Sequence, residues 1–484
     1  MHVFMLGWEF PPYISGGLGT ACLGLTKALG KRHTSISFVM PQALDQAQIC
    51  PSHLTLLSAG RSSDTQIPDS SADSASHGWT YRGPSNTITS STPDRSIRFE
   101  PVPSAITSPY QFAGMQGLHQ LGQGIDELKT QQQSVPGLPQ TQVQDPVTSP
   151  YEGDLLAEAA HYADQCVKIA RRADIGHFDV IHAHDWLTFP AGLAVSRATG
   201  TPLVVHIHST EFDRCPGHIN RPIFDIERRG MHGAMRVICV SHLTQSVVQH
   251  RYGVDPKKIQ VIYNGIDAGP GPTVKASGIG PSEKIVLFLG RITTQKGPAF
   301  FLQAARRVLE KYDQVKFVVA GSGDQVQEMM QAAAEYGIEN KVVFTGFLRG
   351  RDVEQVFRMA DVYVMPSVSE PFGIAPLEAI SHDVPVIISR TSGVAEVLTH
   401  ALKVDFWDID EIANKIIAVL RHPPLSRTLR RHADMEIRQL NWDGAAAKCL
   451  KVYRQAVESM ESRHGHMVQM TRAADGSKTS PGPR

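Results

Sequence analysis

The sequence predicts an α/β protein with two domains, each built around a parallel sheet. At 484 residues the chain is too long for one ordinary core, and about two to three domains are expected. Apolar runs of strand length recur along it, and most lead into a polar or glycine-containing loop and then a helical pattern. A segment rich in glycine and proline, residues 268–283, separates two such series. We therefore expect two Rossmann-like α/β units, one on each side of this segment.

The composition excludes several classes of protein. Lysine and arginine number 47, as do aspartate and glutamate, so no net charge attracts nucleic acid or an anionic membrane. No apolar run approaches the roughly 18 residues of a membrane span. The six cysteines show no C-x-x-C spacing and are expected to be reduced core thiols. We expect a cytoplasmic protein without a membrane segment, whose N-terminus is a first strand and not a signal peptide.

The first domain, expected over residues 1–267, begins with a strand, a glycine-rich loop and a helix. The strand covers residues 2–7, Glu9 opens the loop, and the helix covers residues 18–30. The glycines of the loop are Gly16, Gly17 and Gly19. Glycines let a backbone approach a ligand closely, and a following helix N-terminus favours an anion. A lone G-G-x-G is weak evidence, because an ordinary glycine turn explains it equally well.

Two stretches of the first domain differ in composition from the rest. Residues 43–94 are rich in serine, threonine, aspartate and proline, and residues 111–148 in glutamine, glycine and proline. Neither buries enough apolar surface to offset the entropy of ordering, so we expect mobile insertions. Between them, residues 96–102 are expected to form a strand.

Two further strands of the first domain end in polar side chains. One leads to His184, Asp185 and Trp186, and the next leads to His208. Open α/β sheets bind ligands at the carboxyl ends of their strands, so these residues are expected near a ligand. Two more histidines, His182 and His206, lie two residues earlier on the same strands. A metal site is one interpretation, but packing in the core is the more ordinary one, and we favour it.

The second domain, expected over residues 284–440, opens with a strand that ends in a pair of cations. Arg291 and Lys296 follow the glycine at the end of this strand. A bidentate arginine and a point-charge lysine suit the negative charge of a phosphate group. An isolated pair at this spacing usually lies on solvated surface. The place of this pair after a strand and a glycine favours phosphate binding over a position on the solvated surface.

A second loop of this domain joins a strand to a helix and carries two carboxylates. Glu370 lies in the loop and Glu378 in the first turns of the helix, with Gly373 and Ile374 between them. The carboxylates suit hydroxyls at two ends of one ligand, and the amides between them suit its phosphate. The alternative is acidic residues that only complement the helix dipole. A later Asp-x-Asp at 408–410 is expected to cap a helix and not to bind metal.

These motifs together resemble a known family. Glu370-Pro-Phe-Gly-Ile and Glu378 resemble the signature of retaining glycosyltransferases with the GT-B fold, in the group that includes bacterial glycogen and starch synthases. The resemblance covers most of the chain, although Ile14-Ser15 stand where the family's usual lysine precedes the glycines. It implies that the two Rossmann-like domains face each other across a cleft, and that a helix over 441–461 crosses back to the first domain. It also implies transfer without a metal or other cofactor. The polar remainder, residues 462–484, is expected to be a disordered tail.

The resemblance implies roles for individual residues. Those assigned to catalysis are His208, Arg291, Lys296 and Glu370. Those assigned to the nucleotide-sugar are Gly16, Gly17, Gly19, Gly373, Ile374, Glu378 and Gly393, the last in a loop that resembles the family's G-G-x-x-E. Those assigned to the acceptor side are Glu9, His184, Asp185 and Trp186. No metal ligand is assigned.

The function that the resemblance implies is hexose transfer, in the manner of a glycogen or starch synthase. The donor is expected to be ADP- or UDP-glucose and the acceptor an α-glucan. One alternative is a related transferase that acts on a lipid, a sugar phosphate or a small metabolite. A phosphorylase with bound pyridoxal phosphate and a non-catalytic glucan-binding protein are others, and the second of these would be expected to have lost Arg291, Lys296 or Glu370.

Overall fold

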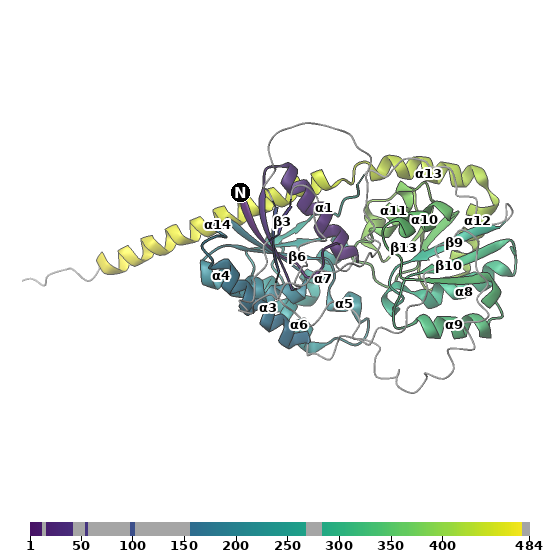
Figure 1. Cartoon of the computed structure of the whole chain (residues 1–484), viewed down its shortest axis with the longest axis horizontal. Helices are drawn as coiled ribbons and strands as arrows, with labels where there is room; N and C mark the ends of the chain where they lie inside the picture. The colour runs from purple at the N-terminus through teal and green to yellow at the C-terminus, as the bar shows by residue number, and fades with distance from the viewer. Residues whose placement is uncertain (12–15, 42–53, 57–96, 102–154, 268–282, 477–484) are drawn as a thin grey trace, which may run out of the picture.

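The chain forms two α/β domains that lie next to each other along the long axis of the molecule (Figure 1). A computed structural model describes residues 1–11, 16–41, 54–56, 97–101, 155–267 and 283–476. Most of the two expected insertions, and almost all of the expected linker, lie outside the described residues. The predicted α/β class is confirmed in both halves.

The first domain contains an eight-stranded sheet in the order β3-β4-β2-β1-β5-β6-β7-β8, and the strands pair in parallel. The strands are β1 (His2–Leu6), β2 (Ser35–Met40), β3 (Leu54–Leu56), β4 (Ile97–Pro101), β5 (Val180–His184), β6 (Leu203–Ile207), β7 (Arg236–Cys239) and β8 (Ile259–Val261). Strand β4 confirms the prediction for residues 96–102. Strand β3 lies within the expected insertion over 43–94, where residues 54–56 pair with β4 at the sheet edge.

Helices cover both faces of this sheet. They are α1 (Gly17–Lys31), α3 (Leu155–Ala170), α4 (Phe189–Thr199), α5 (Glu211–Arg214), α6 (Arg221–Gly233) and α7 (His242–Tyr252). One core cluster packs α3, α4 and α6 against one face, and another packs α1 and the C-terminal helix against the other. The strands are apolar in near-continuous runs because both faces are buried.

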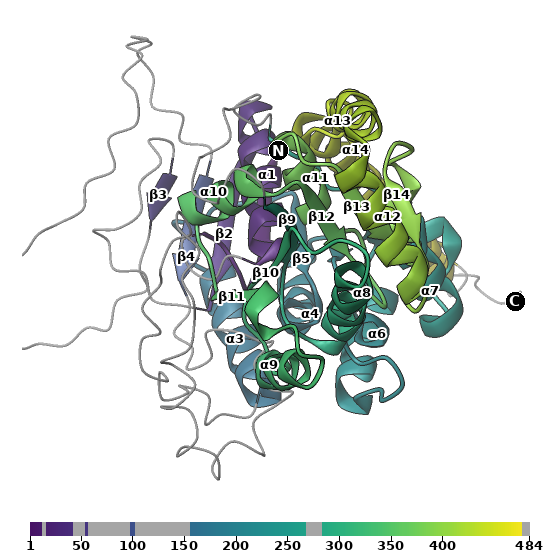
Figure 2. The same cartoon turned by 90° about the vertical axis from the view of Figure 1, so that its right-hand side faces the viewer.

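The second domain contains a six-stranded parallel sheet in the order β11-β10-β9-β12-β13-β14. The strands are β9 (Lys284–Leu289), β10 (Val315–Ala320), β11 (Val342–Gly346), β12 (Val362–Met365), β13 (Val386–Ser389) and β14 (Leu402–Val404). The helices are α8 (Pro298–Leu309), α9 (Val326–Glu335), α10 (Arg351–Met359), α11 (Ala375–Ser381), α12 (Ile409–Arg421) and α13 (Pro423–Ile437). These helices again cover both faces (Figure 2). The Asp408 side chain accepts from the amide of Glu411 at the start of α12, which confirms the predicted cap.

The C-terminal helix α14 (Trp442–Gly476) returns to the first domain, along which it runs before it projects beyond it (Figure 1). Its start packs closely on α1, because a Cβ on Gly24 would lie 2.1 Å from the Trp442 ring. The helix corrects two predicted boundaries, since it continues well past residue 461 into the expected tail. Only residues 477–484 of that tail lie outside the described residues.

Candidate active site

Two loops at the carboxyl ends of β9 and β12 bring the predicted cations and a predicted carboxylate together. The Lys296 Nζ lies 2.5 Å from Oε2 of Glu370, which also accepts from the Ser367 hydroxyl at 3.2 Å. Arg291 donates to Oε1 of Gln295 at 3.3 Å. The carbonyl of Gln295 in turn accepts from the amide of Val368 at 2.9 Å, so the two loops are joined by backbone as well as by charge.

A glycine makes this close approach of the two loops possible. Gly297 follows Lys296 with a φ of +68°, and a Cβ there would lie 2.1 Å from the carbonyl oxygen of Pro366. Any other residue would push the Lys296 loop away from the loop that carries Glu370. The glycine that follows Lys296 is therefore explained by this close approach of the two loops.

The turn after Glu370 places backbone donors and a second carboxylate beside the same point. Gly373 has a φ of +97° and precedes Ile374, the N-cap residue of α11. Glu378 lies in the first turn of that helix and is half-buried. Burial raises the pKa of Glu378 to about 7. Its carboxyl therefore changes charge near neutral pH.

Gly393 lies behind the Glu370 loop and against the first domain. Its amide donates to the carbonyl of Glu370 at 2.9 Å, so this donor is used within the protein. A Cβ on Gly393 would lie 2.5 Å from the Cβ of Ser241 in the first domain. Gly393 thus lets the two domains meet, and its predicted contact with the donor stays a prediction.

Glu396, three residues later, bridges the domains directly. Its carboxylate accepts from the amides of His242 and Leu243 at 2.9 and 2.7 Å, at the start of α7, and from the hydroxyl of Tyr263 at 3.0 Å. A carboxylate at a helix N-terminus is favoured by the unpaired amides and by the helix dipole. The second domain therefore caps a helix of the first.

On the first domain, the predicted histidine lies at the end of β6. His208 is half-buried, and its Nε2 lies 2.9 Å from Nδ1 of His184. The Asp185 carboxylate accepts from the amides of His208 and Ser209 at 2.7 and 3.3 Å and fixes the start of this loop. Burial lowers the pKa of His208 to about 3, so its ring is neutral at physiological pH.

The four residues predicted for the acceptor side are all buried. Glu9, His184, Asp185 and Trp186 are exposed by 1%, 0%, 5% and 3%. Burial raises the pKa of Glu9 to about 7. The charge of Arg291 and hydrogen bonds from the amides of Gly19 and Gly16 lower this pKa, but by less than burial raises it. Their direct contact with an acceptor stays a prediction.

The predicted glycine loop is described only from Gly16 onward. The Glu9 carboxylate lies against Gly16, where a Cβ would be 2.8 Å from Oε2. Gly17 begins α1 and has open space at its Cβ position, whereas Gly19 is buried in the first turn. A carboxyl group of the protein thus already faces this helix start, and the predicted contact with donor phosphates stays untested.

Two residues to which the sequence analysis assigns no role, Asp213 and Ser369, connect the two domains beside the site. Asp213 accepts from Ser369 of the second domain at 2.6 Å, next to Glu370. Its other oxygen accepts from the amide and hydroxyl of Thr210 at 2.8 and 2.7 Å. The Thr-x-x-Asp spacing is a capping-box signal that could have placed Asp213 at a helix start. Its bond to Ser369 depends on how the domains sit, which no local pattern reports.

A buried ion-pair network lies just behind this connection. Arg214 donates to Glu211 at 3.3 Å, to the carbonyl of Ser209 at 3.2 Å and also to Glu227. Tyr252 donates to Glu227 as well. The guanidinium is therefore held by two carboxylates, and its charge is neutralised within the first domain.

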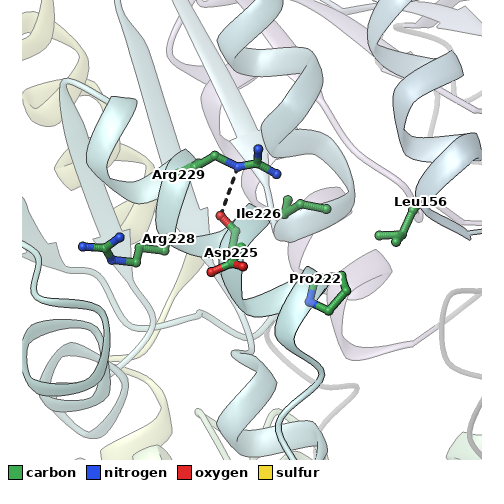
Figure 3. Close-up of a pocket in the computed structure, with 6 residues that line it drawn as sticks. All are labelled: Leu156, Pro222, Asp225, Ile226, Arg228 and Arg229. Carbon is green, nitrogen blue, oxygen red and sulfur yellow. Dashed lines mark hydrogen bonds between the residues drawn. The ribbon is translucent and has the colours of Figure 1, made fainter.

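A separate hollow of about 520 Å³ lies beside α6 (Figure 3). Its lining residues are Leu156, Pro222, Asp225, Ile226, Arg228 and Arg229. Arg229 folds back along its own helix and donates to the carbonyl of Asp225 at 3.2 Å. None of the predicted site residues is among those that line this hollow. Among the described helices, none combines the length and the apolar character that crossing a membrane requires.

Two family models match the chain in succession. Residues 134–269 match the model of glycosyltransferase family 4, and residues 273–435 match the model of glycosyl transferases group 1. The change from one to the other falls at the expected linker. The second match contains Arg291, Lys296, Glu370 and Glu378.

Curated proteins give the same family. The chain is 31% identical over 333 residues to the uncharacterized glycosyltransferase MJ1607 of Methanocaldococcus jannaschii, which covers 65% of this chain and 84% of that protein. It is 29% identical over 327 residues to a D-inositol 3-phosphate glycosyltransferase of Pseudarthrobacter chlorophenolicus, which covers 63% of this chain and 76% of that one.

Solved structures with the same fold include two of cyanobacterial origin. Sucrose-phosphate synthase from Thermosynechococcus elongatus superposes with a TM-score of 0.66 at 17% identity, over 95% of this chain and 99% of that one. Anabaena HepE, in complex with UDP and glucose, gives 0.59 at 17% identity over 95% and 99%. Taken with the two facing sheets and the matched cation and carboxylate loops, these likenesses show that the chain belongs to the group 1 glycosyltransferases and has the GT-B fold.

Proposed function

We propose that the protein transfers glucose from UDP- or ADP-glucose to an α-glucan, with retention of anomeric configuration. The observation that carries the donor part is the meeting of Arg291, Lys296 and Glu370 at the carboxyl ends of β9 and β12. Two cations and a carboxylate in one place suit a sugar diphosphate, whose phosphates need positive charge and whose sugar offers hydroxyls. The relation to HepE, described with UDP and glucose, supports this donor class.

Each residue has a proposed part in donor binding. Arg291 and Lys296 bind the diphosphate, and the amides of Gly373 and Ile374 lie toward a phosphate and the ribose. Glu378 accepts from the ribose hydroxyls, as its place in the first turn of α11 supports. Glu370 and His208 contact the sugar from opposite domains.

Catalysis is proposed to rest on charge stabilisation and positioning. As the bond to the sugar breaks, charge develops on the distal phosphate, and Lys296 leaves Glu370 to pair with it. The leaving phosphate oxygen accepts the proton of the incoming hydroxyl. The fixed charges of Arg291 and Lys296 serve the leaving group here, so no metal ion is assigned to this step.

The acceptor is proposed to be a neutral glycan. Arg214, next to Asp213 in sequence, is already held by two carboxylates of the first domain. An acceptor phosphate would need a cation of its own, whereas hydroxyls are suited by the carboxylate and imidazole groups on this side. A second candidate is a sugar-phosphate acceptor, which the names of two relatives favour.

The test is release of nucleotide from UDP-, ADP- and GDP-sugars, measured with glycogen, with a sugar phosphate and without acceptor. Glycogen-dependent release from UDP- or ADP-glucose, with retention shown by NMR of the product linkage, is the expected result. Release that depends on the sugar phosphate instead would keep the donor site and replace the acceptor. No release with any donor would overturn the proposal.

The proposed setting is the reducing cytoplasm. Cys22, Cys166, Cys215, Cys239 and Cys449 are free thiols in the structure, and four of these five are buried. Buried free thiols act as small apolar side chains and need no oxidising compartment.

A further inference from the structure

Three histidines lie side by side in the core of the first domain, one layer beneath His208. His182 and His184 are two residues apart on β5 and so share a face, and His206 of β6 pairs in register with His184. The ring centroids of His182 and His206 are 5.3 Å apart, as are those of His184 and His206. All three side chains are buried, with exposures of 0%, 0% and 3%.

These rings have nitrogen atoms without a protein partner. Nε2 of His182, Nε2 of His184 and both ring nitrogens of His206 make no hydrogen bond within the described part of the chain. A buried polar atom without a partner is costly, and native cores rarely leave several of them together. Four such atoms in one cluster indicate a bound species that contacts them.

The remaining nitrogens show how two of the rings are held. Nδ1 of His182 lies 2.6 Å from the hydroxyl of Tyr453 on α14, and Nδ1 of His184 lies 2.9 Å from Nε2 of His208. Metal-binding histidines typically have one ring nitrogen fixed by such a partner while the other faces the ion. Here the fixed nitrogen is Nδ1 in both rings, so the unpartnered Nε2 atoms are the candidate ligands.

We propose that His182, His184 and His206 bind one divalent transition metal ion, with zinc as the preferred occupant. One ligand atom from each ring lies within 4.8 Å of the others. A tetrahedral zinc with Zn–N bonds of about 2.0–2.1 Å needs nitrogens roughly 3.4 Å apart, so the rings must close on the ion. Three imidazoles suit zinc, and a water molecule takes the fourth position.

The charge state of the rings is compatible with this ligand set. Burial lowers the pKa of His182 to about 3, and it lowers the pKa of His184 and His206 well below the usual value. Neutral rings offer a lone pair to a metal without first losing a proton. His208, which contacts His184 at 2.9 Å, is less buried than the three rings of the cluster.

The proposed ion lies apart from the proposed phosphate chemistry and links elements of the first domain. It joins β5 to β6 and, through Tyr453, joins both strands to α14. This revises the expectation from the sequence, which favoured core packing for His182 and His206. Their burial is as expected, but their unpartnered nitrogens are an observation that only the structure supplies.

The experiment is metal analysis of the full chain purified without a histidine tag. Mass spectrometry of the metal content is expected to give close to one zinc per chain. Protein stripped with a chelator is then titrated with Co²⁺, which gives intense visible absorption bands when bound in a tetrahedral site. Neither reading depends on transferase activity, so failure here is separate from failure of the proposed function.

His206→Phe is the test variant, because phenylalanine keeps a ring of similar size and removes both ligand atoms. His250→Phe is the matched control, since His250 is exposed on α7 and, within the described residues, hydrogen-bonds to Ser246 of the same helix. The expected result is loss of zinc and of the Co²⁺ bands in the first variant alone.

Two results would overturn the proposal. One is a wild-type chain that retains no zinc and gives no tetrahedral Co²⁺ spectrum, which would leave buried water as the partner of these nitrogens. The other is Co²⁺ binding that His206→Phe leaves intact. If His206→Phe does not fold, the wild-type metal content and Co²⁺ spectrum alone decide the matter.

Discussion

Lys296 and Glu370 form an ion pair with their charged atoms 2.5 Å apart, at the point where the donor diphosphate is proposed to bind. The two groups come from separate loops and are 74 positions apart in sequence. The pair holds the lysine in place before a donor arrives. A phosphate that competes for Lys296 also frees Glu370 for a sugar hydroxyl.

We therefore predict that Lys296→Ala lowers turnover by about 10²–10³-fold, the cost of removing one donor to a developing charge. The reason is that Arg291 remains but one of the two positive charges proposed to stabilise the leaving phosphate is lost. The measurement is kcat with saturating donor. Lys257→Ala is the control, because Lys257 is exposed on the first domain. Unchanged kcat with a modest rise in donor KM would show that Lys296 only binds.

Glu378 gives a prediction about pH. With a pKa of about 7 in the fold, its carboxylate is ionised above neutrality and accepts more strongly from ribose hydroxyls. Donor KM is expected to fall as the pH rises from about 6 to about 8. In Glu378→Gln the KM should be higher and nearly independent of pH over this range. A KM profile that is the same in both proteins would contradict this role.

The same group has an opposite effect on stability. Its pKa in the fold is above the usual 4.5, so the folded state holds a proton that the unfolded state has lost. Its contribution to the free energy of unfolding therefore decreases as pH rises from about 4.5 to about 7 and is constant above that. Chemical denaturation at a series of pH values should show a weaker decrease in Glu378→Gln.

The bond between Ser369 and Asp213 predicts a change in donor affinity. Ser369→Ala removes the hydroxyl that joins the Glu370 loop to the first domain at 2.6 Å. Loss of one such bond typically costs about 0.5–1.5 kcal/mol, so donor KM should rise about two- to tenfold. Ser246→Ala, on the exposed face of α7, is the control. An unaltered KM would mean that contacts other than this bond hold the Glu370 loop against the first domain.

Glu396 predicts a change in the arrangement of the domains. Glu396→Gln keeps the size of the side chain but weakens its bonds to the first amides of α7. Because the contact is partly exposed, we expect a loss of no more than about 1 kcal/mol. Small-angle X-ray scattering without ligand should then show a larger radius of gyration. The same radius in both proteins would rule out a role for this cap in closure.

Gly265 gives a prediction about the crossing of the chain between domains. The amide of the next residue, Ile266, donates to the carbonyl of Leu440 at 2.8 Å. A Cβ on Gly265 would lie 2.4 Å from the backbone nitrogen of Trp442. Gly265→Ala must move one of these backbones and is expected to cost about 1–3 kcal/mol. Thermal unfolding measures this. Gly444→Ala, whose Cβ would meet an atom no nearer than 3.3 Å, should change the melting temperature little.

The parts of the site that the sequence predicts are those set by local pattern. The cations after β9 and the carboxylates around α11 follow from a strand, a glycine and a helix start, and each lies within a few residues of these signals. Lys296 and Glu370 meet because parallel neighbours β9 and β12 end at the same edge. That is a rule of topology, so the sequence can predict it.

The parts that the sequence does not predict depend on the placement of one domain against the other. Glu396 and Asp213 both act across that boundary, and their partners lie 153 and 156 residues away. The four residues predicted for the acceptor side are buried, which the sequence motif did not indicate. A motif identifies residues but does not say how far each lies from the surface. The polar sequence after residue 462 has no apolar stripe and predicted a tail, yet a helix that projects from the body needs no apolar face.

Helix α14 carries a consequence for the order in which the protein is made. Its Trp442, Cys449 and Tyr453 complete the core that β1 and α1 begin, although more than four hundred residues of synthesis separate them. The first domain therefore leaves the ribosome with one face of its sheet covered by α1 but not yet by α14. That face stays incomplete while the whole second domain is translated, and α14 completes it. A nascent chain stopped before residue 442 is thus a partner for chaperones and not a finished domain.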